Sequence, residues 1–113
     1  MMKAVDFENM AAQGDILIIR TDKIPAEVVE KKSRDGAHIV THSETGHHHT
    51  VDAANARFFD GGQMICYLQV AEATELVHHR SFDTHAPINL TPGNYKIVRQ
   101  REHTPEGWRR IED

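Results

Sequence analysis

Residues 57–70 read RFFDGGQMICYLQV, two apolar runs joined by Gly61-Gly62. A two-residue glycine link between such runs is a strong signal for a β-hairpin, because glycine adopts the positive φ angles of a tight turn. We therefore expect strands at 57–60 and 63–70, paired through a two-residue turn. This hairpin makes an all-β fold the first hypothesis.

Short runs rich in β-branched residues lie on both sides of this hairpin, separated by residues that favour turns. The runs are 15–20, 28–32, 37–42, 47–51, 74–79, 88–90 and 95–100. Asp35-Gly36 suits a tight turn, so the runs on either side of it are expected to pair, and residues 91–94 should close another hairpin. Seven or eight short strands predict a small single-domain all-β barrel or sandwich.

The two ends of the chain are expected to add short elements to a single domain spanning residues 1–113. Residues 1–13 are predicted to form an N-terminal arm or a short helix. Thr104-Pro105-Glu106 fits an N-cap followed by proline at the first helical position, which predicts a short C-terminal helix at 104–112.

The composition excludes several classes of protein. A formal charge of −4 argues against a nucleic-acid partner, and 39% hydrophobic residues suit a soluble domain. Cys66 is the only cysteine and lies in an apolar run, so we expect a buried inert thiol. The chain starts without a signal-peptide core and has no membrane-length apolar stretch. A cytoplasmic protein is predicted, or a virion component if the origin is a phage.

The most unusual feature is a run of three histidines, His47 to His49, among nine in the chain. Residues 43–46 are expected to form the loop of a hairpin with His42 opposite His47 and Val40 opposite His49. One face would carry six side chains, those of His38, Val40, His42, His47, His49 and Val51. His48 would point to the other face, together with Ile39, Thr41 and Thr50, because side chains alternate along a strand.

Imidazoles gathered on one rigid face favour a divalent transition metal such as zinc, iron or nickel. The loop 80–84 would also bring two further histidines together. The candidate metal ligands are His42, His47, His49, His79 and His85. Solvated histidines and a pH-responsive interface are the alternatives, and His38 and His103 are expected at the surface.

Two resemblances extend this prediction. The His47-x-His49 pair in a small β-domain, with Gly61 downstream, resembles the first metal motif of cupins, although Ala53 and Ala54 stand where cupins have a carboxylate. Five segments resemble a group of small uncharacterised proteins from bacterial and phage genomes. The segments are 14–17 (GDIL), 45–49 (TGHHH), 85–88 (HAPI), 92–95 (PGNY) and 98–102 (VRQRE). That resemblance implies that His47, His49 and His85 form one site.

The function predicted from these patterns is a non-catalytic β-domain that binds a divalent transition metal and self-associates. No general base accompanies the histidines, which favours binding over catalysis. One alternative is a phage virion protein, such as a capsid decoration protein or another assembly component, with a capsid or assembly partner. The other is a cupin-like metal-dependent enzyme. Neither a membrane nor a nucleic acid is expected as a partner.

Overall fold

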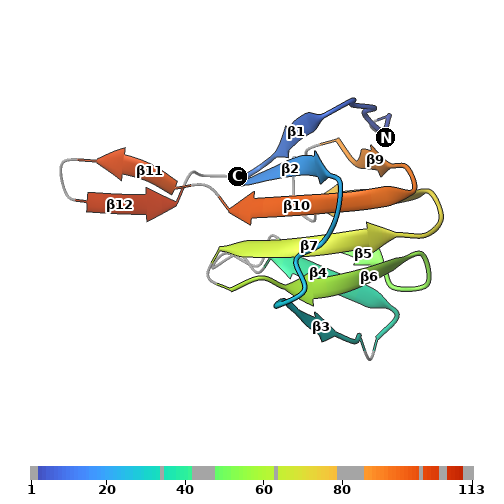
Figure 1. Cartoon of the computed structure of the whole chain (residues 1–113). Coiled ribbons are helices and arrows are strands. Elements are labelled where there is room, and N and C mark those ends of the chain that lie inside the picture. Colours follow the sequence, from blue (N-terminus) through green and yellow to red (C-terminus); the bar gives the residue numbers. More distant parts are fainter. Residues whose placement is uncertain are drawn as a thin grey trace.

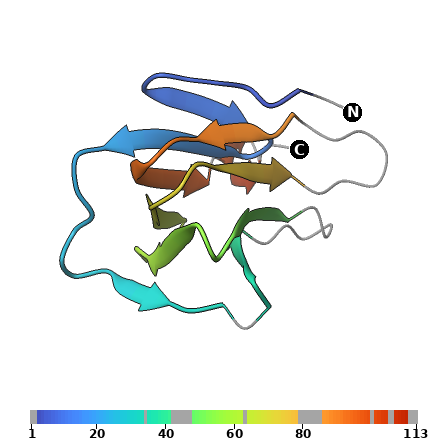
Figure 2. The ribbon, with the colours of Figure 1, turned by 90° about the vertical axis from the view of Figure 1, so that its right-hand side faces the viewer.

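Two antiparallel sheets lie face to face as a sandwich (Figures 1 and 2). This computed structural model describes residues 3–33, 35–41, 48–62, 64–78, 86–99, 101–104 and 107–110, the last two ranges and Thr41 by their backbone. The sheets do not close into a barrel. Of the two architectures expected from the sequence, the sandwich is therefore confirmed.

The larger sheet contains six strands and the smaller sheet four. The strands of the larger sheet are β1 (Met10–Gln13), β2 (Ile16–Thr21), β3 (Val29–Lys31), β6 (Ala56–Asp60), β7 (Ile65–Val70) and β10 (Gly93–Arg99), in the order β1-β2-β10-β7-β6-β3. The strands of the smaller sheet are β4 (Ala37–Thr41), β5 (His49–Asp52), β8 (Thr74–His78) and β9 (Ile88–Leu90), in the order β4-β5-β8-β9.

The core lies between the sheets because the central strands, such as β2, β7, β8 and β10, alternate buried and more accessible residues. On β2, Ile16 and Ile18 are buried, whereas Leu17 and Ile19 are only half-buried on the outer face. Leu68 on β7 and Leu76 on β8 meet this layer from the two sheets, and both are 0% exposed. Cys66 belongs to the same core, as predicted.

Two predicted hairpins are wrong, because at both turns the chain crosses from one sheet to the other. The strands flanking Asp35-Gly36 do not pair: β3 pairs with β6, and β4 pairs with β5. Around residues 91–94, β9 pairs with β8, while β10 pairs with β2 and β7. Gly36 does adopt the predicted positive φ, at 80°. A turn residue specifies a reversal of direction, and burial of the flanking strands decides which sheet each one joins.

The hairpin around Gly61-Gly62 is confirmed, but its turn is longer than the two residues expected. Asp60 pairs with Cys66, and the Gly61 amide donates to the Ile65 carbonyl at 3.1 Å. The Gly62 amide donates to Asp60 Oδ1 at 2.9 Å, which stabilises the start of the turn.

The predicted helices are also wrong, since the described residues contain none. Accordingly, no helix there is long and apolar enough to cross a membrane. Near the N-terminus the chain is an ordered arm: Val5 bridges Ile88, and β1 follows. Near the C-terminus, β11 (Arg101–Thr104) and β12 (Gly107–Arg110) form a hairpin that extends from one end of the sandwich (Figure 1). Proline in a short link suits a turn as well as a helix start.

Candidate functional site

Buried polar side chains from both sheets meet at one end of the sandwich. His49 begins β5 and pairs with His78, the last residue of β8. Asp15 directly precedes β2, and Arg99 ends β10 opposite Ile16. Asp15, His49 and His78 are 0% exposed and Gln13 is 2% exposed. We call Gln13, Asp15, His49, His78 and Arg99 the polar cluster.

Asp15 is the centre of this polar cluster. Its Oδ1 lies 3.1 Å from His49 Nε2, and its Oδ2 accepts a hydrogen bond from Arg99 Nε at 3.1 Å. The carboxylate thereby links β5 of the smaller sheet to β10 of the larger one. Buried charges are tolerated when they are paired and hydrogen-bonded in this way.

Gln13 determines how the His49 ring is protonated. Its Nε2 donates to the carbonyls of Leu76 and Ala86, both at 3.0 Å, so its Oε1 must be the atom 2.9 Å from His49 Nδ1. An amide oxygen and a carboxylate oxygen can only accept hydrogen bonds. Both ring nitrogens of His49 therefore donate, and the ring is an imidazolium.

The same contacts set the charge of Asp15. Burial raises the pKa of the Asp15 carboxyl. The hydrogen bonds from His49 and Arg99, together with their charges, lower this pKa by more than burial raises it. The net pKa lies well below the ordinary value of 3.8. Asp15 is thus an anion between two cations, and these three side chains together carry a net positive charge.

The two buried histidines stack on each other beside a glycine. Their ring centroids are 4.0 Å apart and their planes differ by 8°. Gly14 lies against both rings with a φ of +57°, and a Cβ there would lie 2.8 Å from His78 Cε1 and 3.2 Å from His49 Cε1. Glycine is required at this position both by its backbone conformation and by the close contact.

The ring protonation can be tested by NMR. In a long-range ¹H–¹⁵N spectrum recorded at neutral pH, His49 should show two protonated ring nitrogens rather than one protonated and one bare. A Gln13→Leu variant removes one acceptor and should abolish that pattern at His49. If the unmodified protein shows a bare ring nitrogen at His49, the assignment is wrong.

Of the five predicted metal ligands, the described residues include His49 alone. His42, His47, His79 and His85 lie outside them. The described residues hold no group of three His, Cys, Asp or Glu side chains arranged for a metal ion. In this arrangement both ring nitrogens of His49 already bond to Gln13 and Asp15.

The described residues of the predicted histidine face do share one side of the sheet. The predicted pairing of residues between β4 and β5 is wrong. His38, Val40, His49 and Val51 are all buried, whereas Ile39 is 38% exposed. His49 pairs with Thr41 rather than Val40, because an irregularity between Ile39 and Thr41 shifts the register. The predicted pairing of His42 with His47 lies outside the described residues.

His38 was expected at the surface, and that prediction is wrong. It is 7% exposed, its Nε2 donates to the Ala56 carbonyl at 2.9 Å, and its ring stacks on Phe58. A backbone partner satisfies its polar edge and lets the ring enter the core. The side chain of His103 on β11 is outside the described residues.

Sequence reasoning missed Gln13, Asp15 and Arg99. Asp15 is 34 residues from His49 and 84 from Arg99, so no local spacing connects them. The one available signal was Asp15 itself, which begins the apolar run 15–20. Aspartate is rarely buried, so an aspartate that starts a buried strand is unusual.

Comparison with known proteins identifies a family but no characterised relative. A family model described as a domain of unknown function (DUF8820) matches residues 12–100, a range that includes the whole polar cluster. Neither the curated proteins nor the solved structures include a match to the chain.

Proposed function

The chain belongs to the DUF8820 family, and we propose that it is a non-catalytic β-domain that binds a divalent transition metal at the histidine-rich end of its sandwich. The observation that supports this is the convergence of strand ends. β4 ends at Thr41, β5 starts at His49, β8 ends at His78, and the chain is described again from Ala86, two residues before β9. Because neighbouring strands in this sheet are antiparallel, these four strand ends all lie at the same end of the smaller sheet.

The candidate ligands adjoin these ends in the sequence. His42 follows Thr41, His79 follows His78, His85 precedes Ala86, and His47 stands two residues before His49. Neighbouring strands lie about 4.8 Å apart and successive Cα atoms about 3.8 Å apart, so the described residues beside these histidines in the sequence lie close together. Four imidazoles are a sufficient ligand set for zinc, iron or nickel.

The polar cluster supplies a rigid base for such a site. Gln13 ties the Ala86 carbonyl to the Leu76 carbonyl, and the stacked His49 and His78 rings join β5 to β8. Metal ligands need support that limits their motion to fractions of an ångström. We therefore assign His49 to this base and propose His42, His47, His79 and His85 as ligands.

A binding role is favoured over catalysis by the state of the reactive groups. Burial raises the pKa of the Cys66 thiol to about 12, with a contribution from the Asp60 charge, so the thiol is not a nucleophile. The Asp15–His49 pair is wholly buried and charged. Since the sheets do not form a barrel, the architecture also gives no support to a cupin-like enzyme.

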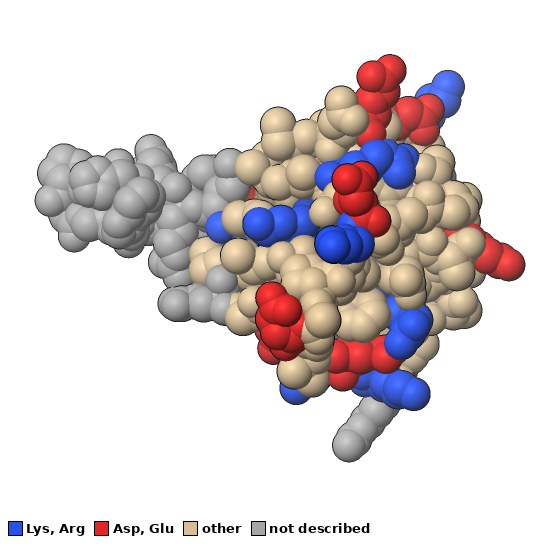
Figure 3. Space-filling model, in the orientation of Figure 1, with Lys and Arg blue, Asp and Glu red and all other residues tan. Residues whose placement is uncertain are grey.

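Self-association remains part of the proposal, with an assembly role as the second candidate. The observation in favour of assembly is the β11–β12 hairpin, which pairs with neither sheet and extends away from them (Figure 1). Acidic and basic side chains are interspersed on the face in Figure 3, which suits a protein partner better than a nucleic acid. The mass in solution, by light scattering, distinguishes a monomer from an assembly.

Elemental analysis of the purified protein tests metal binding. We expect about one equivalent of zinc, iron or nickel for each set of the four proposed ligands, His42, His47, His79 and His85. A His47→Ala/His85→Ala variant should lose it, because two of the four proposed ligands are gone. His48→Ala is the matched control and should retain the metal. Less than about 0.1 equivalent in the unmodified protein, or equal metal in both variants, would contradict the proposal.

A further inference from the structure

The two sheets of the sandwich end in four edge strands: β1 and β3 border the larger sheet, and β4 and β9 border the smaller one. An edge strand presents unpaired backbone N–H and C=O groups, to which a strand of another chain can bond. Many proteins protect such edges with charged residues, bulges or a covering segment. Among the described residues, three of the four edges carry such protection and β1 carries none.

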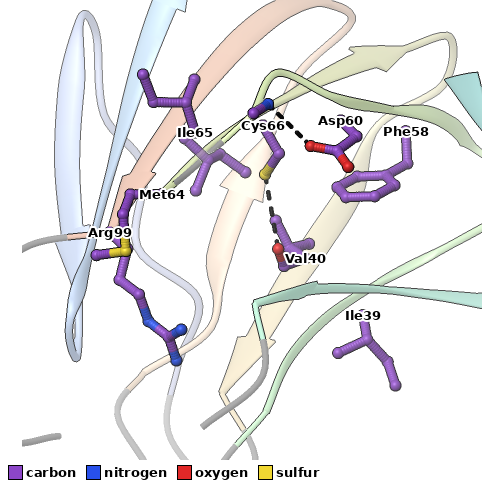
Figure 4. Close-up of a pocket in the computed structure, with 10 residues that line it drawn as sticks. Ile39, Val40, Phe58, Asp60, Met64, Ile65, Cys66 and Arg99 are labelled. Carbon is purple, nitrogen blue, oxygen red and sulfur yellow. Dashed lines mark hydrogen bonds between the residues drawn. The ribbon is translucent and has the colours of Figure 1, made fainter. Parts of the chain in front are cut away.

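Each protected edge has a different feature that hinders pairing with a further strand. β3 ends at the exposed Lys31, and the exposed Lys32 follows it. β4 has an irregularity after Ile39, beside the pocket of about 320 Å³ that Figure 4 shows. β9 is covered by the N-terminal arm, because Val5 makes two backbone hydrogen bonds to it and its flanking residue, of 2.8 and 2.9 Å.

β1 forms an apolar and regular border at the top of the larger sheet in Figure 1. Its sequence is MAAQ, without a charge or a proline, and its pairing with β2 is continuous. Met10 is 58% exposed and Ala12 is exposed as well. Both side chains lie on the outer face of the sheet, opposite Ile19 and Leu17 of β2.

The backbone groups of β1 point alternately toward β2 and away from it. The register that places Met10 opposite Ile19 places Asn9 opposite Arg20, and the Arg20 amide donates to the Asn9 carbonyl at 2.9 Å. Residues 9, 11 and 13 therefore direct their N–H and C=O groups to β2. The N–H and C=O groups of Met10 and Ala12 point outward, and within the described part of the chain no backbone group bonds to them.

We propose that β1 pairs with β1 of a second copy of this chain, antiparallel about a twofold axis at Ala11, so that the two larger sheets become one. This register places Met10 of each copy opposite Ala12 of the other. Both residues present outward backbone groups and lie on the same face, so each Met10–Ala12 pair can form two hydrogen bonds. The exposed Glu8 would lie opposite Gly14 and would meet no like charge.

This pairing supplies a surface for the self-association proposed above, on which it rests, and it involves neither the histidines nor a metal. A second copy is favoured over an unrelated strand because a twofold interface requires a patch that complements itself. The β1 edge meets that requirement in the spacing of its outward groups and in the face that its side chains share.

The mass of the full chain in solution tests the pairing, with a chelator present so that metal cannot contribute. Light scattering from about 20 µM to about 1 mM should show the mass rising from that of one chain toward that of two. A monomer over this whole range would overturn the pairing. Because the chelator removes the metal, that result would leave the proposed metal site standing.

Variants locate the interface on β1. Ala12→Pro removes an outward N–H that bonds to nothing in β2, so an edge strand tolerates it, and it should weaken the dimer at least about tenfold. Met10→Lys adds a charge to the edge at an exposed side chain and should weaken the dimer at least about fivefold. Val29→Lys is the matched control, since Val29 is 57% exposed on the other edge of the same sheet. A dimer that survives Met10→Lys, or that Val29→Lys weakens equally, would contradict pairing through β1 and point to self-association by another surface.

Disulfide cross-linking tests the register. In mild oxidant Ala11→Cys should link two chains, because the Cα atoms of residues paired at the axis lie about 4.5 Å apart. Ala12→Cys is the matched control, since its two copies are offset along the strands and lie beyond the reach of about 7 Å. Cys66 is buried and is present in both variants. Equal cross-linking of the two variants, or none in Ala11→Cys, would contradict the register.

Discussion

Replacing Asp15 with alanine is expected to lower the free energy of unfolding by about 3–5 kcal/mol at neutral pH, a large part of the stability of a small domain. The substitution leaves the buried His49 and the partly buried Arg99 without the carboxylate that lies 3.1 Å from each. Urea denaturation followed by circular dichroism measures the loss. Asp22→Ala, at an exposed aspartate, is the control and should change stability by less than about 0.5 kcal/mol.

The Asp15→Ala effect should also depend on pH in a defined direction. The pKa of Asp15 in the folded protein lies below its ordinary value of 3.8, so its stabilising contribution is fully present above that value. The contribution is lost as the pH falls through the lower, folded pKa. The stability difference between the two proteins should therefore shrink as the pH falls below about pH 4. A difference that grows as the pH falls through this acidic range would contradict the ion pairing.

Replacing Gly14 with alanine is the second large effect expected, a loss of about 2–4 kcal/mol. Part of the loss comes from a φ of +57°, which disfavours any residue with a Cβ. The remainder comes from the contact at 2.8 Å with the His78 ring, which is held in a stack with His49 and cannot move without disturbing it. Thermal denaturation of the variant measures the total.

Gly36→Ala separates these two contributions. Gly36 also has a positive φ, at +80°, but a Cβ there would meet no atom within 4 Å. Its substitution should cost only the backbone term of about 1–2 kcal/mol. If the two alanine variants lose equal stability, then contact with the imidazoles contributes nothing. Movement of the His49 and His78 ring signals in Gly14→Ala alone would support the packing argument.

Local patterns predicted the elements of this fold well where alternation was clear. The run 15–20 predicted a buried strand, and β2 spans Ile16–Thr21. That Val40, His49 and Val51 share one face followed from the period of two along β4 and β5, and the structure shows that this face is buried. Proline and glycine signals were less reliable, because Pro105 suits a helix start and a turn equally, and Gly61-Gly62 lies in a longer turn than its sequence suggested.

The amino-acid sequence alone determined that this protein is all-β, and which described residues of the histidine-bearing strands share one face. Side-chain alternation carries that information locally. Only the tertiary structure decided that β3 and β4 belong to different sheets, and that Gln13, Asp15 and Arg99 meet His49 and His78 at one end. Those contacts join residues as much as 84 positions apart, and the energy of burying and pairing their charges exists only once both sheets are assembled. The triple histidine therefore singled out His49 in the sequence, and the fold gave His49 its buried role beside Asp15.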